Sequence, residues 1–151
     1  MFKKILVCLD GSSFSEQVLR YASEEATATS KNLVLLHVVM LPIVNTVAIP
    51  GAATNIGSMP SPEQIAAYET KAKTYLNEKA KSLKEAGIDT ECVVIVGNPG
   101  QTIVDYAEKN DIDLIAIATH GRSGIKRVIF GSVAEYVIKN SRLPILLIKP
   151  K

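Results

Sequence analysis

The chain of 151 residues is long enough for one domain with a buried core, and 47% of its residues are hydrophobic. The formal net charge of +2, the absence of tryptophan and the low aromatic content argue against a general nucleic-acid-binding protein. No apolar run approaches the roughly 18 residues of a membrane span, and the first apolar run meets Asp10 too early for a secretory signal peptide. We therefore expect a single domain over residues 1–151, located in the cytoplasm, that binds neither nucleic acid nor a membrane.

The chain has two cysteines, Cys8 and Cys92, and each lies inside an apolar run. No Cys-x-x-Cys motif is present. This pattern favours two buried free thiols over a disulfide or a redox pair.

Two buried strands are predicted in the first forty residues. Residues 3–9 form a short apolar run that ends at Asp10, and residues 33–39 form a second run. Between them, apolar residues recur at helical spacing. Ser13 and Glu16 have the Ser-x-x-Glu spacing of a capping box, so we expect the helix to begin at Ser13.

Residues 40–60 break this periodicity. Prolines and glycines punctuate a segment with almost no charge: Pro42, Pro50, Gly51, Gly57 and Pro60. Loops of this length inside compact domains are usually lids, binding segments or disordered pieces. A lid and a mobile loop packed at an interface both remain open.

A long helix is predicted to follow this loop. Ser61 is a capping residue, Pro62 occupies the first helical position and Gln64 follows three residues after the cap. Apolar residues then recur at helical spacing until Gly87 ends the helix. Residues 90–96 are the third predicted strand.

The last third of the chain repeats the same alternation. Asn98 starts a third helix that stops near Asn110, and residues 113–118 are the fourth strand. A fourth capping box, Ser132 to Glu135, opens the fourth helix, and residues 143–149 form a final strand.

Alternating buried strands and amphipathic helices predict an α/β fold: a doubly wound, five-stranded parallel sheet with helices on both faces. Such folds bind ligands outside the carboxyl ends of the strands, where the winding direction reverses. The segments expected there begin at Asp10, after Val39, at residues 97–98 and at residues 119–131.

The loop at residues 119–131 is unusually long for a connection between a strand and a helix. It carries three glycines and three cations: Gly121, Gly124, Gly131, Arg122, Lys126 and Arg127. The helix that follows offers unpaired N–H groups at Ser132, Val133 and Ala134. Neither a Walker A motif nor G-x-G-x-x-G is present. A phosphate site and a purely structural loop both remain open, because Glu135 could cap the helix and compete with an anion.

Four stretches together resemble the universal stress protein family. They read Lys-Lys-Ile-Leu-Val-(x2)-Asp-Gly-Ser from residue 3, Leu-Leu-His-Val from residue 35, Thr-His-Gly-Arg-Ser-Gly-(x6)-Gly-Ser-Val-Ala-Glu from residue 119 and Pro-Ile-Leu-Leu-Ile from residue 144. The nucleotide-binding branch of that family has the pattern G-x2-G-x9-G-[ST]. Gly121 and Gly131-Ser132 match it, and Ala118 stands where the pattern has its first glycine.

The resemblance implies an ATP-binding fold with strand order 3-2-1-4-5, with ATP bound alone or with Mg²⁺. It places Asp10 at the ribose or at a metal-bridged phosphate, and Val38 at adenine through backbone groups. The ribose and phosphates would meet Ala118, Gly121, Gly131, Ser132 and Val133. Arg122 and Gly124 are added as candidate binding residues because the loop itself offers a cation and a glycine there.

Each of these assignments has a structural alternative. Asp10 could simply begin a turn, and His37 fits a buried, hydrogen-bonded core histidine. His120 could act as a general base or merely order the loop. Lys126 and Arg127 could form a solvated face.

Three functions are compatible with this pattern. The first is an ATP-dependent stress or signalling switch that forms a homodimer through the apolar edge strand at residues 143–149. The second is a slow Mg²⁺-dependent ATPase, since no residue is clearly placed to activate water. The third is a dimerisation module that has lost nucleotide binding. A receiver-like or flavodoxin-like module is disfavoured, because Leu9 stands where a receiver needs a second carboxylate.

Overall fold

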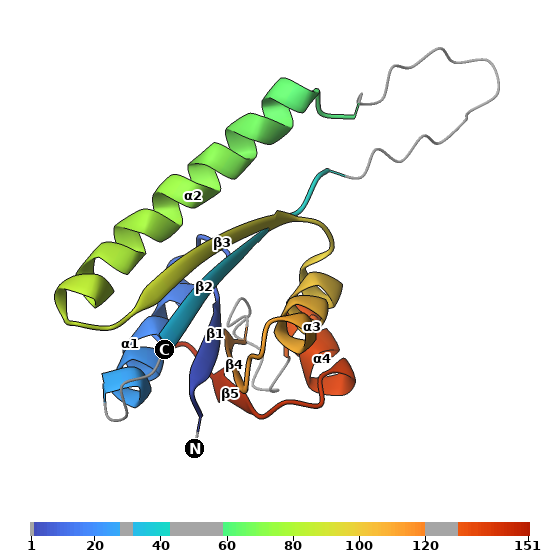
Figure 1. The fold of residues 1–151 in the computed structure, drawn as a ribbon. Helices are drawn as coiled ribbons and strands as arrows, with labels where there is room; N and C mark the ends of the chain where they lie inside the picture. The colour runs from blue at the N-terminus through green and yellow to red at the C-terminus, as the bar shows by residue number, and fades with distance from the viewer. Residues whose placement is uncertain (1, 28–31, 43–58, 120–129) are drawn as a thin grey trace, which may run out of the picture.

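The computed structural model describes residues 2–27, 32–42, 59–119 and 130–151 (Figure 1). Strands and helices alternate throughout this part of the chain. They are β1 (Lys4–Cys8), α1 (Ser13–Thr27), β2 (Asn32–Val39), α2 (Pro62–Glu85), β3 (Thr90–Val96), α3 (Pro99–Lys109), β4 (Leu114–Ala118), α4 (Ser132–Asn140) and β5 (Ile145–Ile148).

The strands form one parallel sheet in the order β3-β2-β1-β4-β5, which confirms the predicted fold class. The chain winds outward from β1 to β3 and then crosses back to β4 and β5. The winding direction therefore reverses at β1, between β2 and β4. In such folds the carboxyl ends of the strands at this reversal form the ligand-binding crevice.

Helices α1 and α2 cover one face of the sheet, and α3 and α4 cover the other (Figure 1). Along β1, Ile5 and Val7 pack under α1 and α2, whereas Leu6 and Cys8 pack under α3 and α4. Because both faces are covered, β1 is apolar and buried at every position from Ile5 to Cys8 instead of alternating with polar residues. Among the described helices, none is both long and apolar enough to pass through a bilayer.

The predicted start of α2 is confirmed in detail. The backbone N–H of Gln64 donates to the Ser61 side chain at 3.2 Å, and the Ser61 backbone N–H donates to the Gln64 side chain at 2.8 Å. Gly87 follows the end of the helix with φ of +80°, a conformation that glycine adopts without steric cost.

The capping box predicted for α1 is wrong by one residue. Ser12 caps this helix, because its Oγ accepts the backbone N–H of Ser15 at 3.2 Å. The Glu16 carboxylate instead accepts the Tyr75 hydroxyl at 3.1 Å and pairs with Lys79 at 2.9 Å. Both partners lie on α2, so these contacts could not be predicted from the local sequence around α1.

Both cysteines are free, as predicted. Cys8 is buried and Cys92 is half-buried. Burial raises the pKa of the Cys8 thiol to about 12, which keeps it protonated and unreactive at neutral pH.

Candidate functional site

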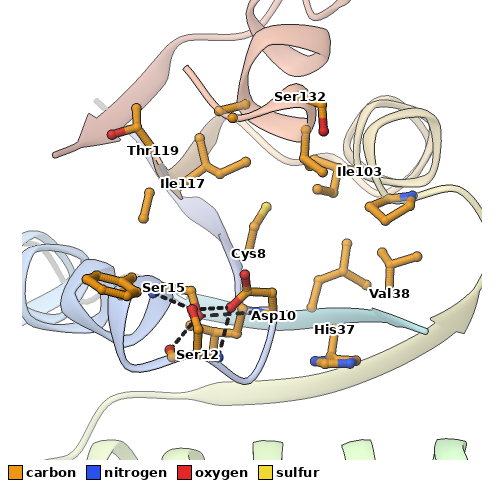
Figure 2. A pocket seen from close by; sticks show the side chains of 18 of the residues that line it. Cys8, Asp10, Ser12, Ser15, His37, Val38, Ile103, Ile117, Thr119 and Ser132 are labelled. Carbon is orange, nitrogen blue, oxygen red and sulfur yellow. Dashed lines mark hydrogen bonds between the residues drawn. The ribbon is translucent and has the colours of Figure 1, made fainter. Parts of the chain in front are cut away.

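A cavity of about 530 Å³ opens where the winding direction of the sheet reverses (Figure 2). Its volume lies in the range typical of small-molecule sites. Strand ends and helix starts line it: Cys8, Leu9, Asp10, Ser12, Phe14, Ser15, Leu36, His37, Val38, Met40, Pro99, Ile103, Ile117, Ala118, Thr119, Gly131, Ser132, Val133 and Ala134.

The cavity opens because β1 ends before its neighbours β2 and β4 do. Its ladder with β2 ends at Cys8 opposite Leu36, after which the Leu9 N–H still donates to the Leu36 carbonyl at 2.9 Å. Gly97 N–H donates to the Val39 carbonyl on the opposite side of β2. Since backbone groups alternate between the two sides of a strand, the N–H and C=O of Val38 face the space beyond the end of β1.

The same geometry holds on β4. The Thr119 N–H donates to the Ile148 carbonyl of β5 at 2.9 Å, so the backbone of Ala118 faces β1. Pairing between β1 and β4 ends at Val7 opposite Ala116. Two strand edges therefore open onto the cavity, one carrying Val38 and the other Ala118.

Asp10 lies where the chain leaves β1 and turns into α1. Gly11 takes φ of +84°, which allows the sharp turn. The carboxylate oxygen Oδ1 of Asp10 accepts two bonds from Ser12, from the backbone N–H at 2.9 Å and from Oγ at 2.5 Å. Asp10 thus begins the turn and also presents its carboxylate to the cavity. The structural role and the proposed binding role are therefore compatible.

The start of α4 differs from those of the other two helices at the cavity. Ser12 caps α1, and the Asn98 side chain caps α3 by accepting the Gln101 N–H at 3.3 Å. In α4 the cap position is Gly131, and within the described part of the chain no side chain caps the helix start. The predicted Ser132–Glu135 capping box is therefore wrong.

The Glu135 carboxylate turns along the helix instead and pairs with Lys139 at 2.6 Å. Its partner is one helical turn away, the spacing at which oppositely charged side chains meet. The first N–H groups of α4 consequently keep their donor capacity and the partial positive charge of the helix start. The competition with an anion foreseen for Glu135 does not occur in this conformation.

His37 lines the cavity but its ring is turned away from it, toward α2 (Figure 2). The ring meets that of Tyr75 edge-on, with centroids 6.1 Å apart. Burial lowers the pKa of His37, opposed by the Asp10 charge and a hydrogen bond to the Leu9 backbone. Its Nδ1 is buried with no partner among the described residues. The expected core histidine is thus half-buried and only partly satisfied.

Six of the predicted site residues lie together around this cavity: Asp10, Val38, Ala118, Gly131, Ser132 and Val133. Figure 2 shows Asp10 and Ser132 on opposite sides of it. The other three, Gly121, Arg122 and Gly124, lie outside the described residues, as do His120, Lys126 and Arg127. The Ala118 side chain packs against the core under α1 and α2.

Sequence reasoning missed the apolar wall that α3 supplies. Pro99 and Ile103 line the cavity from the first turns of α3, and Figure 2 shows Ile103 across the cavity from Asp10. These residues lie at the cavity because α3 begins directly after the carboxyl end of β3. The Asn98 cap marks this helix start in the sequence, so it could have indicated their position. Across the described ranges, no group of three or more His, Cys, Asp or Glu side chains could hold a metal ion together.

Comparison with known proteins places the whole chain in one group. The model of the universal stress protein family matches residues 1–149. The universal stress protein MJ0577 of Methanocaldococcus jannaschii is 30% identical over 159 aligned positions, which cover 100% of this chain and 97% of that protein. The solved structure of MJ0577 aligns with a TM-score of 0.69 at 29% identity, over 100% of this chain and 98% of its own.

Two more distant structures share the fold and hold a nucleotide. A universal stress protein in complex with cAMP has a TM-score of 0.65 at 24% identity, over 97% of this chain and 96% of that chain. An Arabidopsis thaliana family protein with AMP bound has a TM-score of 0.63 at 16% identity, over 99% and 92%.

Proposed function

This chain belongs to the universal stress protein family, and from that premise we propose that it binds an adenine nucleotide, ATP, as a stress or signalling switch. The observation that carries the proposal is the distribution of charge across the cavity. One side presents the Asp10 carboxylate, which accepts hydrogen bonds, and the other presents the uncapped start of α4, which donates them. A molecule with hydroxyls at one end and phosphates at the other fits this arrangement.

We propose a place for each part of the nucleotide in this arrangement. The phosphates lie at the N–H groups of Ser132 and Val133, next to Gly131, which has no side chain of its own to block them. The ribose lies toward Asp10. Adenine lies against the edge of β2, where the backbone groups of Val38 can pair with its polar edge and Ile103 supplies apolar contact.

The remaining predicted contacts complete the proposed site. Ala118 lies on the opposite strand edge, and its methyl group packs into the core under α1 and α2, so the family glycine is not required for space on the α3 side. Gly121 keeps its proposed place at the ribose and phosphates through the family pattern, and Arg122 and Gly124 keep theirs through the cationic, glycine-rich sequence of the loop. The family structures with cAMP and AMP agree with the adenine nucleotide class.

A magnesium ion would come with the phosphates. Asp10 is the carboxylate among the residues that line the cavity. Mg²⁺ is commonly held by one or two carboxylates together with phosphate oxygens and waters, so Asp10 would suit a metal bound jointly with ATP as the alternative to its place at the ribose. The ion supplies charge neutralisation at the phosphates when bound.

We propose binding and release, rather than hydrolysis, as the activity. Of the described lining residues, His37 is turned toward α2 and Asp10 is held by Ser12, so neither is placed to activate a water beside the phosphates. Hydrolysis is at most slow. The two free cysteines suit a reducing compartment, which supports a cytoplasmic location.

Calorimetric titration of the purified protein with ATP and Mg²⁺ tests this function. We expect saturable one-site binding, and mass spectrometry should detect an adenine nucleotide released when the protein is denatured. Absence of binding at millimolar ATP would leave the third function, a module that has lost its nucleotide. Rapid ATP turnover would contradict the switch.

We also propose that the chain forms a homodimer through the edge strand at residues 143–149. β5 lies at one edge of the sheet, and its half-buried side chains are apolar. The Pro144 and Ile148 carbonyls accept bonds from β4, so by alternation the backbone groups of Ile145 and Leu147 face outward. A second β5 can pair with them and cover the edge.

Light scattering on the eluting protein should give a mass of two chains. Leu147→Pro removes an outward-facing N–H and should give a single chain. A parent protein with the mass of one chain at tens of micromolar would contradict the dimer.

A further inference from the structure

A closed ring of hydrogen bonds holds the Asp10 carboxylate in place. Ser12 donates to Asp10 Oδ1 from both its backbone N–H and its Oγ. Ser12 Oγ accepts the Ser15 N–H at 3.2 Å, and Ser15 Oγ donates to the Ser12 carbonyl at 2.9 Å. Ser15 Oγ also accepts the Asp10 N–H at 3.2 Å. Figure 2 shows these bonds on the wall of the cavity that faces Ser132.

The bonds of this ring assign a donor and an acceptor role to each hydroxyl group. Ser12 Oγ already accepts the hydrogen of the Ser15 N–H, so its single hydroxyl hydrogen goes to Asp10. Ser15 Oγ likewise accepts from Asp10 and gives its own hydrogen to the Ser12 carbonyl. The Asp10 oxygen that receives two hydrogens carries none itself. Asp10 Oδ1 therefore acts only as a hydrogen-bond acceptor.

Ser12 fixes the plane of this carboxylate. The terminal torsion of an aspartate is broad and roughly two-fold, and Asp10 is exposed, so nothing in the side chain itself prevents rotation. Two bonds to a single oxygen, one of them at 2.5 Å, remove that freedom. A carboxylate has about four acceptor positions, so it has capacity for hydroxyl groups of a ligand as well.

We propose that Ser12 is a positioning residue that makes this site select ribonucleotides over nucleotides without ribose hydroxyls. The inference rests on the proposed function, because it concerns the sugar of the bound adenine nucleotide. A fixed acceptor favours a ligand that offers the two neighbouring hydroxyls of ribose. A ligand without them keeps the bonds between Ser12 and Asp10 but forgoes the hydrogen bonds that the ribose hydroxyls would add to a charged group.

Calorimetry with ATP and with 2′,3′-dideoxy-ATP measures this selection. The parent protein should bind ATP roughly ten-fold or more tightly than the dideoxy nucleotide, as expected for hydrogen bonds to a charged group. Ser12→Ala should reduce that ratio to within about three-fold, by weakening ATP while leaving dideoxy-ATP unchanged. Ser12→Thr keeps the hydroxyl and should keep most of the ratio. Asp10→Asn should lower the ratio as Ser12→Ala does.

A control separates positioning from helix capping, since Ser12 also caps α1. Ser61→Ala removes the cap of α2, far from the cavity, and should leave the ratio at the parent value. Damage to the fold would weaken both nucleotides together.

Two outcomes would overturn the inference alone: a parent protein that binds ATP and dideoxy-ATP equally, or Ser12→Ala with an undiminished ratio. If the parent binds neither nucleotide, the proposed function fails first and the inference fails with it.

Discussion

Replacing Gly131 by valine is expected to abolish nucleotide binding while the protein stays folded. Gly131 is the cap residue of α4, with φ of −58° and ψ of 155°. Any residue can adopt these angles, so valine introduces no backbone strain. A side chain at a cap position lies over the first N–H groups of the helix. The valine methyl groups would therefore occupy the place proposed for the phosphates.

The expected loss is large because several contacts are lost together. Each hydrogen bond to a charged group contributes about 1.5–3 kcal/mol, so displacing the phosphates from two N–H groups predicts a loss of roughly a hundred-fold or more in affinity. Calorimetric titration with ATP measures it, and circular dichroism shows whether the variant is folded.

Two further variants sharpen this result. Gly131→Asn adds a side chain that caps α4 itself, so it should raise the stability by a few tenths of a kcal/mol while weakening ATP binding. Ser61→Val removes a cap remote from the cavity and should cost about 1 kcal/mol of stability with no loss of affinity. ATP affinity that is unchanged in folded Gly131→Val would rule out the phosphate position.

Replacing Gly100 by alanine should destabilise the protein, although alanine is the better helix former. An added Cβ would lie 2.8 Å from Cγ and Cδ1 of Tyr136 and 2.9 Å from its Cβ. Gly100 lies in the first turn of α3 and Tyr136 lies on α4, where its hydroxyl donates to the Gln101 side chain. The two helices must move apart, which typically costs about 1–3 kcal/mol in a packed interior.

The displacement should also reach the nucleotide site, since the first turns of α3 and α4 both line the cavity. Urea denaturation measures the stability, and the same ATP titration measures the affinity. The double variant Gly100→Ala with Tyr136→Gly removes every one of these close contacts, so its stability loss should be smaller than the sum of the two single losses. A Gly100→Ala protein as stable as the parent would show that the helices tolerate the extra group.

The architecture was predictable from local patterns. Continuous apolar runs with helical stretches between them identify a parallel sheet covered on both faces, because each run must be buried on two sides. The strand order came from the family resemblance, since alternation alone does not determine it. The cap of α2 was equally readable, because Ser61 and Gln64 satisfy each other within one helical turn.

The details of the site depend on contacts between distant segments. Glu16 does not form the predicted capping box, because its carboxylate binds Tyr75 and Lys79 on α2. Glu135 had two local partners available, the helix start and Lys139, and the sequence could not decide between them. The close approach of Gly100 to Tyr136 also appears only when α3 and α4 pack together.

One helix start at the site differs from the other two. Of the three helices that start at the cavity, only α4 begins without a side-chain cap among the described residues. An uncapped start gives up stability that Ser, Asn or Asp at position 131 would supply. A phosphate bound there would replace the missing cap. We therefore expect ATP to stabilise the protein by linkage, with α4 gaining the most protection.

A titration of ¹⁵N-labelled protein with ATP and Mg²⁺, followed by NMR, tests the central claim most directly. The account predicts that the largest amide shifts occur at Ser132, Val133 and Ala134, with a second group at Val38 and Asp10, and that all of them saturate together. Shifts confined to another surface, such as the exposed face of α2, or no shifts at millimolar ATP would contradict it.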